Sequence, residues 1–104
     1  MTYEWSGQGK ASDGRDWTFD LFLDIATGSG EISGRFDWYI DGDLRGTEYV
    51  TGSVNRAGAY AMQGQQKTSG RIVLSSYKGS MDRNRTRING LWVCDGSPGK
   101  FWSN

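Results

Sequence analysis

The chain has 104 residues, enough for one domain with one hydrophobic core. It contains 16 glycines spread along the sequence, a single proline and 13% aromatic residues, which excludes a disordered linker. The 12 basic and 12 acidic residues cancel, which excludes bulk electrostatic attraction to nucleic acid or to an anionic membrane surface. We therefore expect one all-β domain over residues 1–104, with neither nucleic acid nor membrane as partner.

Cysteine usage and the N-terminal residues predict the compartment. Cys94 is the single cysteine, so no intrachain disulfide can form, and such a thiol suits a reducing compartment. It has the same parity as Ile88 and Trp92, which predicts a small buried hydrophobe. No apolar run has the length of a membrane span, and the N-terminus lacks the basic and apolar segments of a signal peptide. These features predict a cytoplasmic protein.

The first half of the chain predicts four strands. Residues 3–9 alternate between large and small or polar side chains, and a turn with an Asp-Gly pair follows at 12–15. The third and fourth strands, residues 32–40 and 47–54, are separated by Asp41-Gly42-Asp43. The second strand is the clearest, because a helix would scatter around its circumference the apolar residues that recur at every second position, Trp17, Phe19, Leu21, Leu23 and Ile25.

The second half predicts four more strands. Residues 60–66 form the fifth, and residues 71–76 begin the sixth, which continues to Met81 through a change of parity near Ser75-Ser76 that indicates a bulge. The seventh covers residues 86–94 and the eighth residues 100–102. The turns between them are expected at residues 82–85 and 95–99, and no segment has helical periodicity.

Ile88-Asn89-Gly90-Leu91-Trp92 shows a pattern, apolar–polar–Gly–x–apolar, that recurs along the chain. Residues of equal parity share one face of a strand, so these glycines are predicted on the buried face, where they permit sharp bends. Bent strands joined by short turns favour closure, because an open meander keeps two exposed edges. We predict an eight-stranded antiparallel up-and-down barrel, filled by side chains or holding one small ligand. A β-sandwich and a barrel with another strand count are the alternatives.

Three stretches resemble the avidin/streptavidin-like branch of the calycin barrels. Residues 32–36 and 47–53 are similar to that family's third and fourth strands, where Thr-Gly-x-Tyr precedes Tyr-x-Leu-Thr-Gly-x-Tyr. Residues 77–81 resemble its aromatic–x–Gly strand, and residues 87–92 look like its Arg-Ile-Asn-x-x-Trp stretch. The resemblance covers about half of the chain, in order, and implies a small calycin-type barrel.

The same resemblance implies that the family's biotin site is not preserved. Its pocket tyrosine falls on Phe36, which has no hydroxyl to donate. Its tryptophan before the aromatic–x–Gly strand has no counterpart in residues 71–74, and Ser75 and Ser76 match the next two polar positions only loosely. Trp92 alone matches directly. Ligand specificity depends on hydrogen-bonding groups at defined positions in the pocket. The resemblance therefore implies the family's fold more strongly than its ligand.

The residue types argue against catalysis and against a metal site. Without histidine, Ser-His-Asp and Cys-His catalysis are impossible, and with one cysteine a zinc site is not expected. Asp20 and Asp24 have the spacing of a carboxylate pair, the basis of an alternative hydrolase hypothesis, but ordinary alternation places them on the solvated outer face. Residues 41–43 lack calcium-loop spacing and predict a hairpin turn. We expect no enzyme activity and no cofactor.

The aromatic residues give the leading functional hypothesis, a non-enzymatic module that binds a small ligand at the open end of the barrel. The alternative for these rings is simple core packing. The predicted ligand-binding residues are Trp5, Trp17, Phe36, Trp38, Ser75 and Trp92.

The competing functional hypothesis is a protein-interaction or self-assembling barrel with a filled interior, whose partner is another protein or a second copy of the chain. Tyr39 and Tyr49, like Phe22, have outward parity. The alternating Arg83, Arg85 and Arg87 are expected to share one face near a turn, and a solubilising hairpin is their alternative role. The predicted interaction surface is therefore Tyr39, Tyr49, Arg83, Arg85 and Arg87.

Overall fold

The computed structural model describes the chain except residues 69, 71 and 95, and its strands form one closed antiparallel barrel. Each strand pairs with the next, and the last pairs with the first, which confirms the predicted up-and-down meander. The strands are β1 (Thr2–Ala11), β2 (Asp16–Ile25), β3 (Glu31–Ile40), β4 (Asp43–Val54), β5 (Ala59–Lys67), β6 (Ser76–Met81), β7 (Ile88–Cys94) and β8 (Ser97–Ser103).

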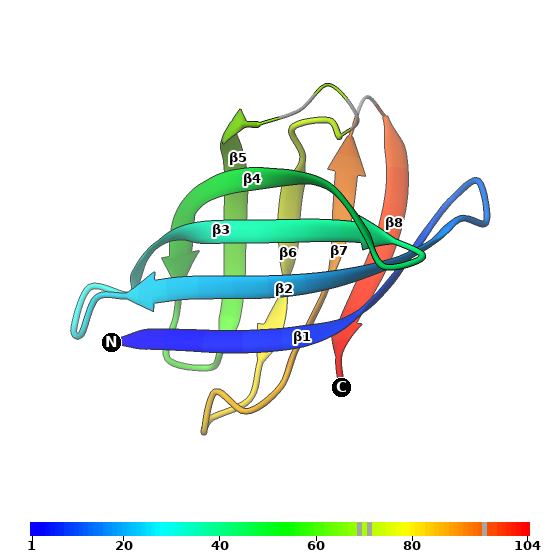
Figure 1. The fold of residues 1–104 in the computed structure, drawn as a ribbon. Helices are drawn as coiled ribbons and strands as arrows, with labels where there is room; N and C mark the ends of the chain where they lie inside the picture. Colours follow the sequence, from blue (N-terminus) through cyan, green and yellow to red (C-terminus); the bar gives the residue numbers. More distant parts are fainter. Residues whose placement is uncertain (69, 71, 95) are drawn as a thin grey trace.

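The barrel has two halves that cross each other. Figure 1 shows β1–β4 running across one side, while β5–β8 stand steeply against them on the other. The extents along the principal axes are 36, 24 and 24 Å. The strands of the first half have 10 to 12 residues and those of the second half 6 to 9, so the first half extends beyond the second.

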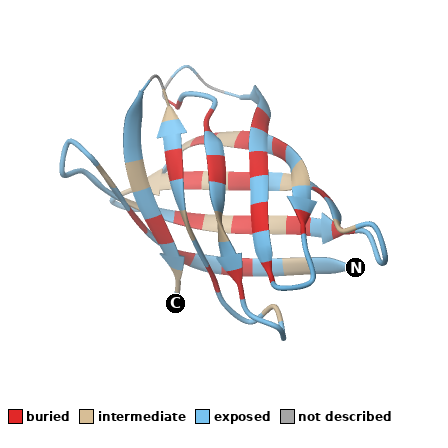
Figure 2. Ribbon diagram, turned by 180° about the vertical axis from the view of Figure 1, so that it is seen from behind, coloured by how far each residue is buried: buried red, intermediate tan, exposed pale blue. Residues whose placement is uncertain are grey.

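Alternating side chains separate the core from the surface, as Figure 2 shows by the banding along each strand. Phe36 is fully buried at the centre of an aromatic cluster. Its ring stacks on Tyr77 at 4.6 Å and on Trp38 at 4.9 Å between centroids, and it meets Phe19 and Phe101 edge to face. Such packing combines large burial with favourable ring geometry, and it fills the middle of the barrel with side chains.

Inward glycines allow neighbouring strands to approach closely. A Cβ atom at Gly34 would lie 2.0 Å from the carbonyl oxygen of Phe22 on β2, and one at Gly52 would lie 2.0 Å from that of Ala61 on β5. No side chain fits at these separations, so the close approach of neighbouring strands at the recurring glycine pattern depends on the missing Cβ atom. At the β3–β4 turn, positive φ angles of 50° at Asp41 and 81° at Gly42 confirm the predicted hairpin.

The sixth strand is shorter than its sequence predicts. It begins at Ser76, and residues 72–75 lie outside any strand; the predicted start at Arg71 lies outside the described residues. The backbone N–H of Ser75 donates to the side chain of Glu48 on β4, while the Ser75 carbonyl oxygen accepts from the N–H of Gly64 on β5. The segment therefore turns inward, which explains the parity change that was assigned to a bulge.

The last two strands also differ from their predicted bounds. β7 begins at Ile88 instead of residue 86, because the Asp82 carboxylate accepts hydrogen bonds from the backbone N–H groups of Thr86 and Arg87 and holds residues 82–87 as a turn. β8 already begins at Ser97, where the sequence predicts a turn, because Ser97 and Pro98 pair in register with Cys94 and Val93 on β7, and the Pro98 carbonyl oxygen accepts from the Ser12 N–H.

Candidate functional site

One end of the barrel opens into a cavity of about 200 Å³. Its rim comes from the β1–β2 turn at Ser12 and Asp13, the β5–β6 connection at Val73, and the start of β8 at Ser97 and Pro98. The exposed rim residues leave the cavity open to solvent, while the aromatic cluster around Phe36 fills the barrel beneath it.

Three tryptophans from three strands form the walls. Trp38 on β3 stands between Trp17 on β2 and Trp92 on β7, with centroid separations of 6.0 and 5.2 Å. The angles between the ring planes are 83° and 69°, so the indoles are adjoining walls of a box and not a parallel stack.

Glycines on β1 and β8 make room for the Trp92 indole. A Cβ atom at Gly99 would lie 2.1 Å from a ring carbon of Trp92, and one at Gly9 would lie 2.8 Å from another. Gly99 is the register partner of Trp92, and Gly9 lies on the neighbouring strand β1. The ring therefore lies across two glycines, which determines its position in the cavity wall.

A buried carboxylate, Glu48 on β4, lies among the lining residues. Its exposed fraction is 1%, and both carboxylate oxygens accept hydrogen bonds. The Tyr77 hydroxyl donates a short bond to Oε1, and the Ser75 backbone N–H donates to Oε2 at 2.8 Å. Gly64 on β5 provides the space, because a Cβ atom there would lie 1.9 Å from Oε2. The cavity thus combines apolar walls with one fixed polar group, as small-molecule sites do.

Two opposing effects act on the Glu48 carboxyl. Desolvation by burial raises its pKa above the ordinary glutamate value, and the hydrogen bonds from Tyr77, Ser75 and Trp38, with the charge of Lys67, counteract part of that rise. Burial and the neighbouring Glu48 carboxylate also raise the pKa of Tyr77, which keeps its hydroxyl protonated and able to donate. Ionisation of the Glu48 carboxyl is therefore costly, and the Tyr77 hydroxyl beside it keeps its proton.

The raised pKa of Glu48 predicts a pH-dependent stability difference between the native chain and Glu48→Gln. The folded state binds a proton more tightly than the unfolded state, so ionisation of Glu48 removes stability as pH rises from the ordinary glutamate pKa, about 4.3, through the higher folded pKa. Glutamine cannot ionise, and the Tyr77 hydroxyl can turn to accept from its amide. We expect the free energy of unfolding of the native chain, relative to the variant, to fall across this window.

Urea titrations of both proteins at successive pH values measure this difference. Because the other titrating carboxylates are common to both chains, their contributions cancel in the subtraction. A difference that stays constant, or that rises with pH, contradicts the stated environment of Glu48.

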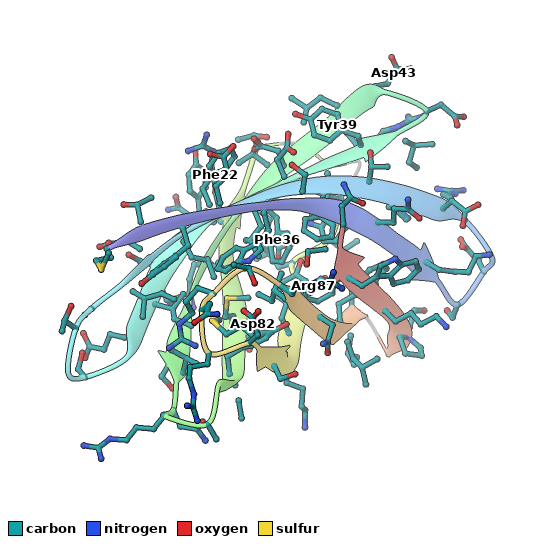
Figure 3. The ribbon with its side chains drawn as sticks, turned by 90° about the horizontal axis from the view of Figure 1, so that it is seen from below. Phe22, Phe36, Tyr39, Asp43, Asp82 and Arg87 are labelled. Carbon is teal, nitrogen blue, oxygen red and sulfur yellow. The ribbon has the colours of Figure 1, made fainter. Side chains whose placement is uncertain are left out.

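The predicted ligand-binding residues divide into two groups. Trp17, Trp38, Ser75 and Trp92 lie together in the cavity lining. Phe36 lies deeper, in the core cluster below, and Figure 3 shows it inside the barrel.

Trp5 is buried elsewhere in the core. It stacks on Tyr3 at 6.0 Å and is paired in register with Leu21. Neither Trp5 nor Phe36 is a lining residue of the cavity. Cys94, predicted to be buried, is only half-buried and lines the cavity instead.

Glu48 and Tyr77 are the site residues that sequence reasoning missed. Glu48 has the same parity as Val50, Gly52 and Val54, so an acidic residue at an inward position was a visible signal. Tyr77 has the inward parity of Met81 on β6 and was noted only for the aromatic–x–Gly resemblance.

The predicted interaction residues do not form one surface. Tyr49 is 45% exposed and lies in a row with Arg35 and Phe22, in register across β2–β4, and the Arg35 guanidinium lies 4.2 Å from the Phe22 ring centroid. Tyr39 is partly buried beside Asp20, farther along β3, and in Figure 3 both it and Phe22 lie outside the barrel.

The three arginines lie at the opposite end of the barrel from the cavity. Arg83, Arg85 and Arg87 belong to the turn at residues 82–87, and Arg85 has a φ angle of 59°, so the strand alternation that was expected to align them is absent. Figure 3 shows Asp82 and Arg87 near each other at this turn. The carboxylates Asp20 and Asp24 are on the outer face, as alternation predicted, and bond to Ser6 and the N-terminal amine.

Comparisons with protein-family models, curated proteins and solved structures give no match for this chain. Among the described residues, no group of three or more histidine, cysteine or acidic side chains is placed to hold a metal ion. Over the same described part, no helix is long and apolar enough to cross a membrane. The small eight-stranded antiparallel barrel and its open cavity are therefore the observations on which function is argued.

Proposed function

We propose that the chain is a non-enzymatic binding module that takes a small ligand into the cavity at the open end of the barrel. The observation that carries this proposal is the combination of three tryptophan walls with a buried carboxylate on fixed hydrogen-bond partners. Small-ligand sites are typically apolar concavities with few, well-placed polar groups. The filled interior below the cavity leaves the rim as the route of entry.

The arrangement supports binding better than catalysis. Glu48 is the one buried acid among the described lining residues, and both of its oxygens already accept hydrogen bonds, so it is held as a fixed acceptor. A carboxylate hydrolase uses a second acid across the substrate, whereas Asp13 is an exposed rim residue. Cys94 also lines the cavity, without a histidine to activate it.

Kinship with the avidin-like calycin barrels is part of the proposal. The meander order and strand number support it, and Trp92 lies in the cavity wall where the resemblance predicts a pocket residue. Biotin is not the ligand we propose, because Phe36 lacks the hydroxyl of the family's pocket tyrosine and is not a lining residue. The single unpaired cysteine supports a reducing compartment, such as the cytoplasm, as the place of action.

Tryptophan fluorescence and thermal shift against a panel of small sugars, planar heterocycles, organic cations and neutral alcohols test the binding proposal. We expect at least one class to quench fluorescence and raise Tm, because a ligand that binds only the folded state stabilises it. Trp38→Phe and Trp92→Phe should weaken that ligand about 3- to 10-fold, since each removes part of an aromatic contact. Trp5→Phe is the matched control outside the cavity and should leave affinity unchanged.

Two results would contradict the proposal. One is the absence of binding by every class in the panel. The other is a loss of affinity in Trp5→Phe as large as in Trp38→Phe or Trp92→Phe, because that would place the ligand outside the cavity or show a general effect on folding.

A protein-interaction module is the second candidate, favoured by a specific observation on β7. Leu91 and Val93 on its outer face are 57% and 48% exposed, and Val93 adjoins Pro98 on β8. Neighbouring exposed apolar side chains are a common feature of protein contacts. Native mass spectrometry separates the two candidates, since a monomer that binds a panel ligand supports the module, and a defined oligomer without ligand supports assembly.

A further inference from the structure

The charged residues among the described lining of the cavity are acidic. Glu48 lies within it and Asp13 lies on its rim, and the described lining residues include neither lysine nor arginine. Lys67 acts on the Glu48 carboxyl from outside the lining, but its ammonium donates to the carbonyl oxygen of Ile72 at 3.0 Å. An anionic ligand would meet like charge among the described lining residues, whereas a cation would meet the buried Glu48 carboxylate.

The tryptophan walls also favour a positively charged ligand. The face of an indole ring carries the negative part of its quadrupole and attracts cations within about 6 Å of the ring centroid. Trp38 stands at a steep angle to both Trp17 and Trp92, and all three rings line the cavity, so a group in the cavity lies beside indole rings of more than one orientation. Walls of this kind are used by proteins to recognise quaternary ammonium groups.

Glu48 also has acceptor capacity beyond its internal bonds. A carboxylate offers about four lone-pair sites, and the hydrogen bonds from Tyr77, Ser75 and Trp38 use three of them, which leaves one for a ligand. The cavity volume of about 200 Å³ leaves room for a substituted ammonium group with a short tail. The cavity volume, the Glu48 charge and the tryptophan rings therefore all favour a small organic cation.

Building on the proposed binding function, we propose that the cavity selects small ligands that carry an organic ammonium group. The Glu48 carboxylate supplies the opposing charge, and the three tryptophans enclose the alkylated nitrogen. Tyr77 and Ser75 are positioning residues, because their hydrogen bonds hold the carboxylate in place at the cavity.

Isothermal titration calorimetry at constant ionic strength tests this with three probes of one shape. Choline carries the quaternary nitrogen, dimethylbutanol replaces that nitrogen by carbon, and dimethylbutyrate carries an anionic group instead. We expect choline to bind the native chain at least about tenfold more tightly than dimethylbutanol, and dimethylbutyrate more weakly than either.

Glu48→Gln, in which the side chain keeps its shape and loses its charge, should lower choline affinity about tenfold and change dimethylbutanol affinity less than about twofold. Glu31→Gln makes the same chemical change at an exposed position at the start of β3, outside the cavity, and should leave both affinities unchanged. Circular dichroism and Tm of each variant show that the fold is retained.

The outcomes distinguish a failure of ammonium selectivity from a failure of the proposed binding function. Equal binding of choline and dimethylbutanol, or choline binding that survives Glu48→Gln, overturns ammonium selectivity and leaves a binding module. Binding of another panel class with no choline binding does the same. Failure of all three probes and of the whole panel overturns both proposals.

Discussion

Phe36→Ala is expected to lower the free energy of unfolding by about 3–5 kcal/mol, the range found for removal of a buried aromatic ring. Phe36 is fully buried and its ring contacts Phe19, Trp38, Tyr77 and Phe101, so its loss leaves a void at the meeting point of both halves of the barrel. Domains of this size have about 5–15 kcal/mol of total stability, so much of the margin would disappear. Urea denaturation followed by fluorescence measures the change.

Phe22→Ala is the matched control for the same truncation. Its ring lies on the outer face against Arg35, a cation–π contact worth about 0.5–1 kcal/mol at an exposed site. We expect the control to lose about that amount. If the two variants lose equal stability, the aromatic cluster around Phe36 is not the centre of the core.

Glu48→Leu is expected to cost about 2–4 kcal/mol of stability at neutral pH. It leaves the Ser75 N–H and the Tyr77 hydroxyl without their acceptor, and each unsatisfied donor costs about 1–3 kcal/mol. Removal of a buried charge offsets part of this cost. The inward turn of residues 72–75 depends on the same hydrogen bond, so the rim on this side of the cavity should loosen as well.

Glu48→Gln is the comparison for this variant, because its amide can still accept from Ser75 and donate to Tyr77. It should retain most of the stability that Glu48→Leu loses, as measured by urea denaturation. Amide hydrogen exchange should show faster exchange at Ser75 in Glu48→Leu alone. Equal protection of Ser75 in all three proteins would mean that Glu48 does not organise this segment.

The strand pattern was largely readable from the sequence because alternation acts locally. Period-two spacing in Trp17–Ile25 identifies β2 without knowledge of its neighbours, and recurring glycines predict bends from the absence of one atom. Short turns then leave consecutive pairing as the simplest arrangement, so strand order and closure followed from the predicted elements. The same parity places Trp38 and Trp92 inside the barrel, and both line the cavity.

Parity alone says which face a residue occupies, but not how far along the barrel it lies. Trp5 and Phe36 are inward like Trp38, yet they lie away from the cavity, because depth depends on strand register and tilt. The arginines at 83, 85 and 87 alternate in sequence, but capping by the Asp82 carboxylate makes the segment a turn, in which alternation has no meaning.

The all-β class, the meander order and the inward set of side chains follow from the sequence alone, since each depends on local periodicity or on neighbouring strands. The site, in contrast, depends on contacts between residues that are far apart in the chain. Glu48 meets Ser75 and Tyr77 across separations of 27 and 29 residues, through a segment that leaves the strand pattern to donate its N–H inward. The contact provides the buried carboxylate with the hydrogen bonds it needs away from water, and Gly64 leaves the space for it.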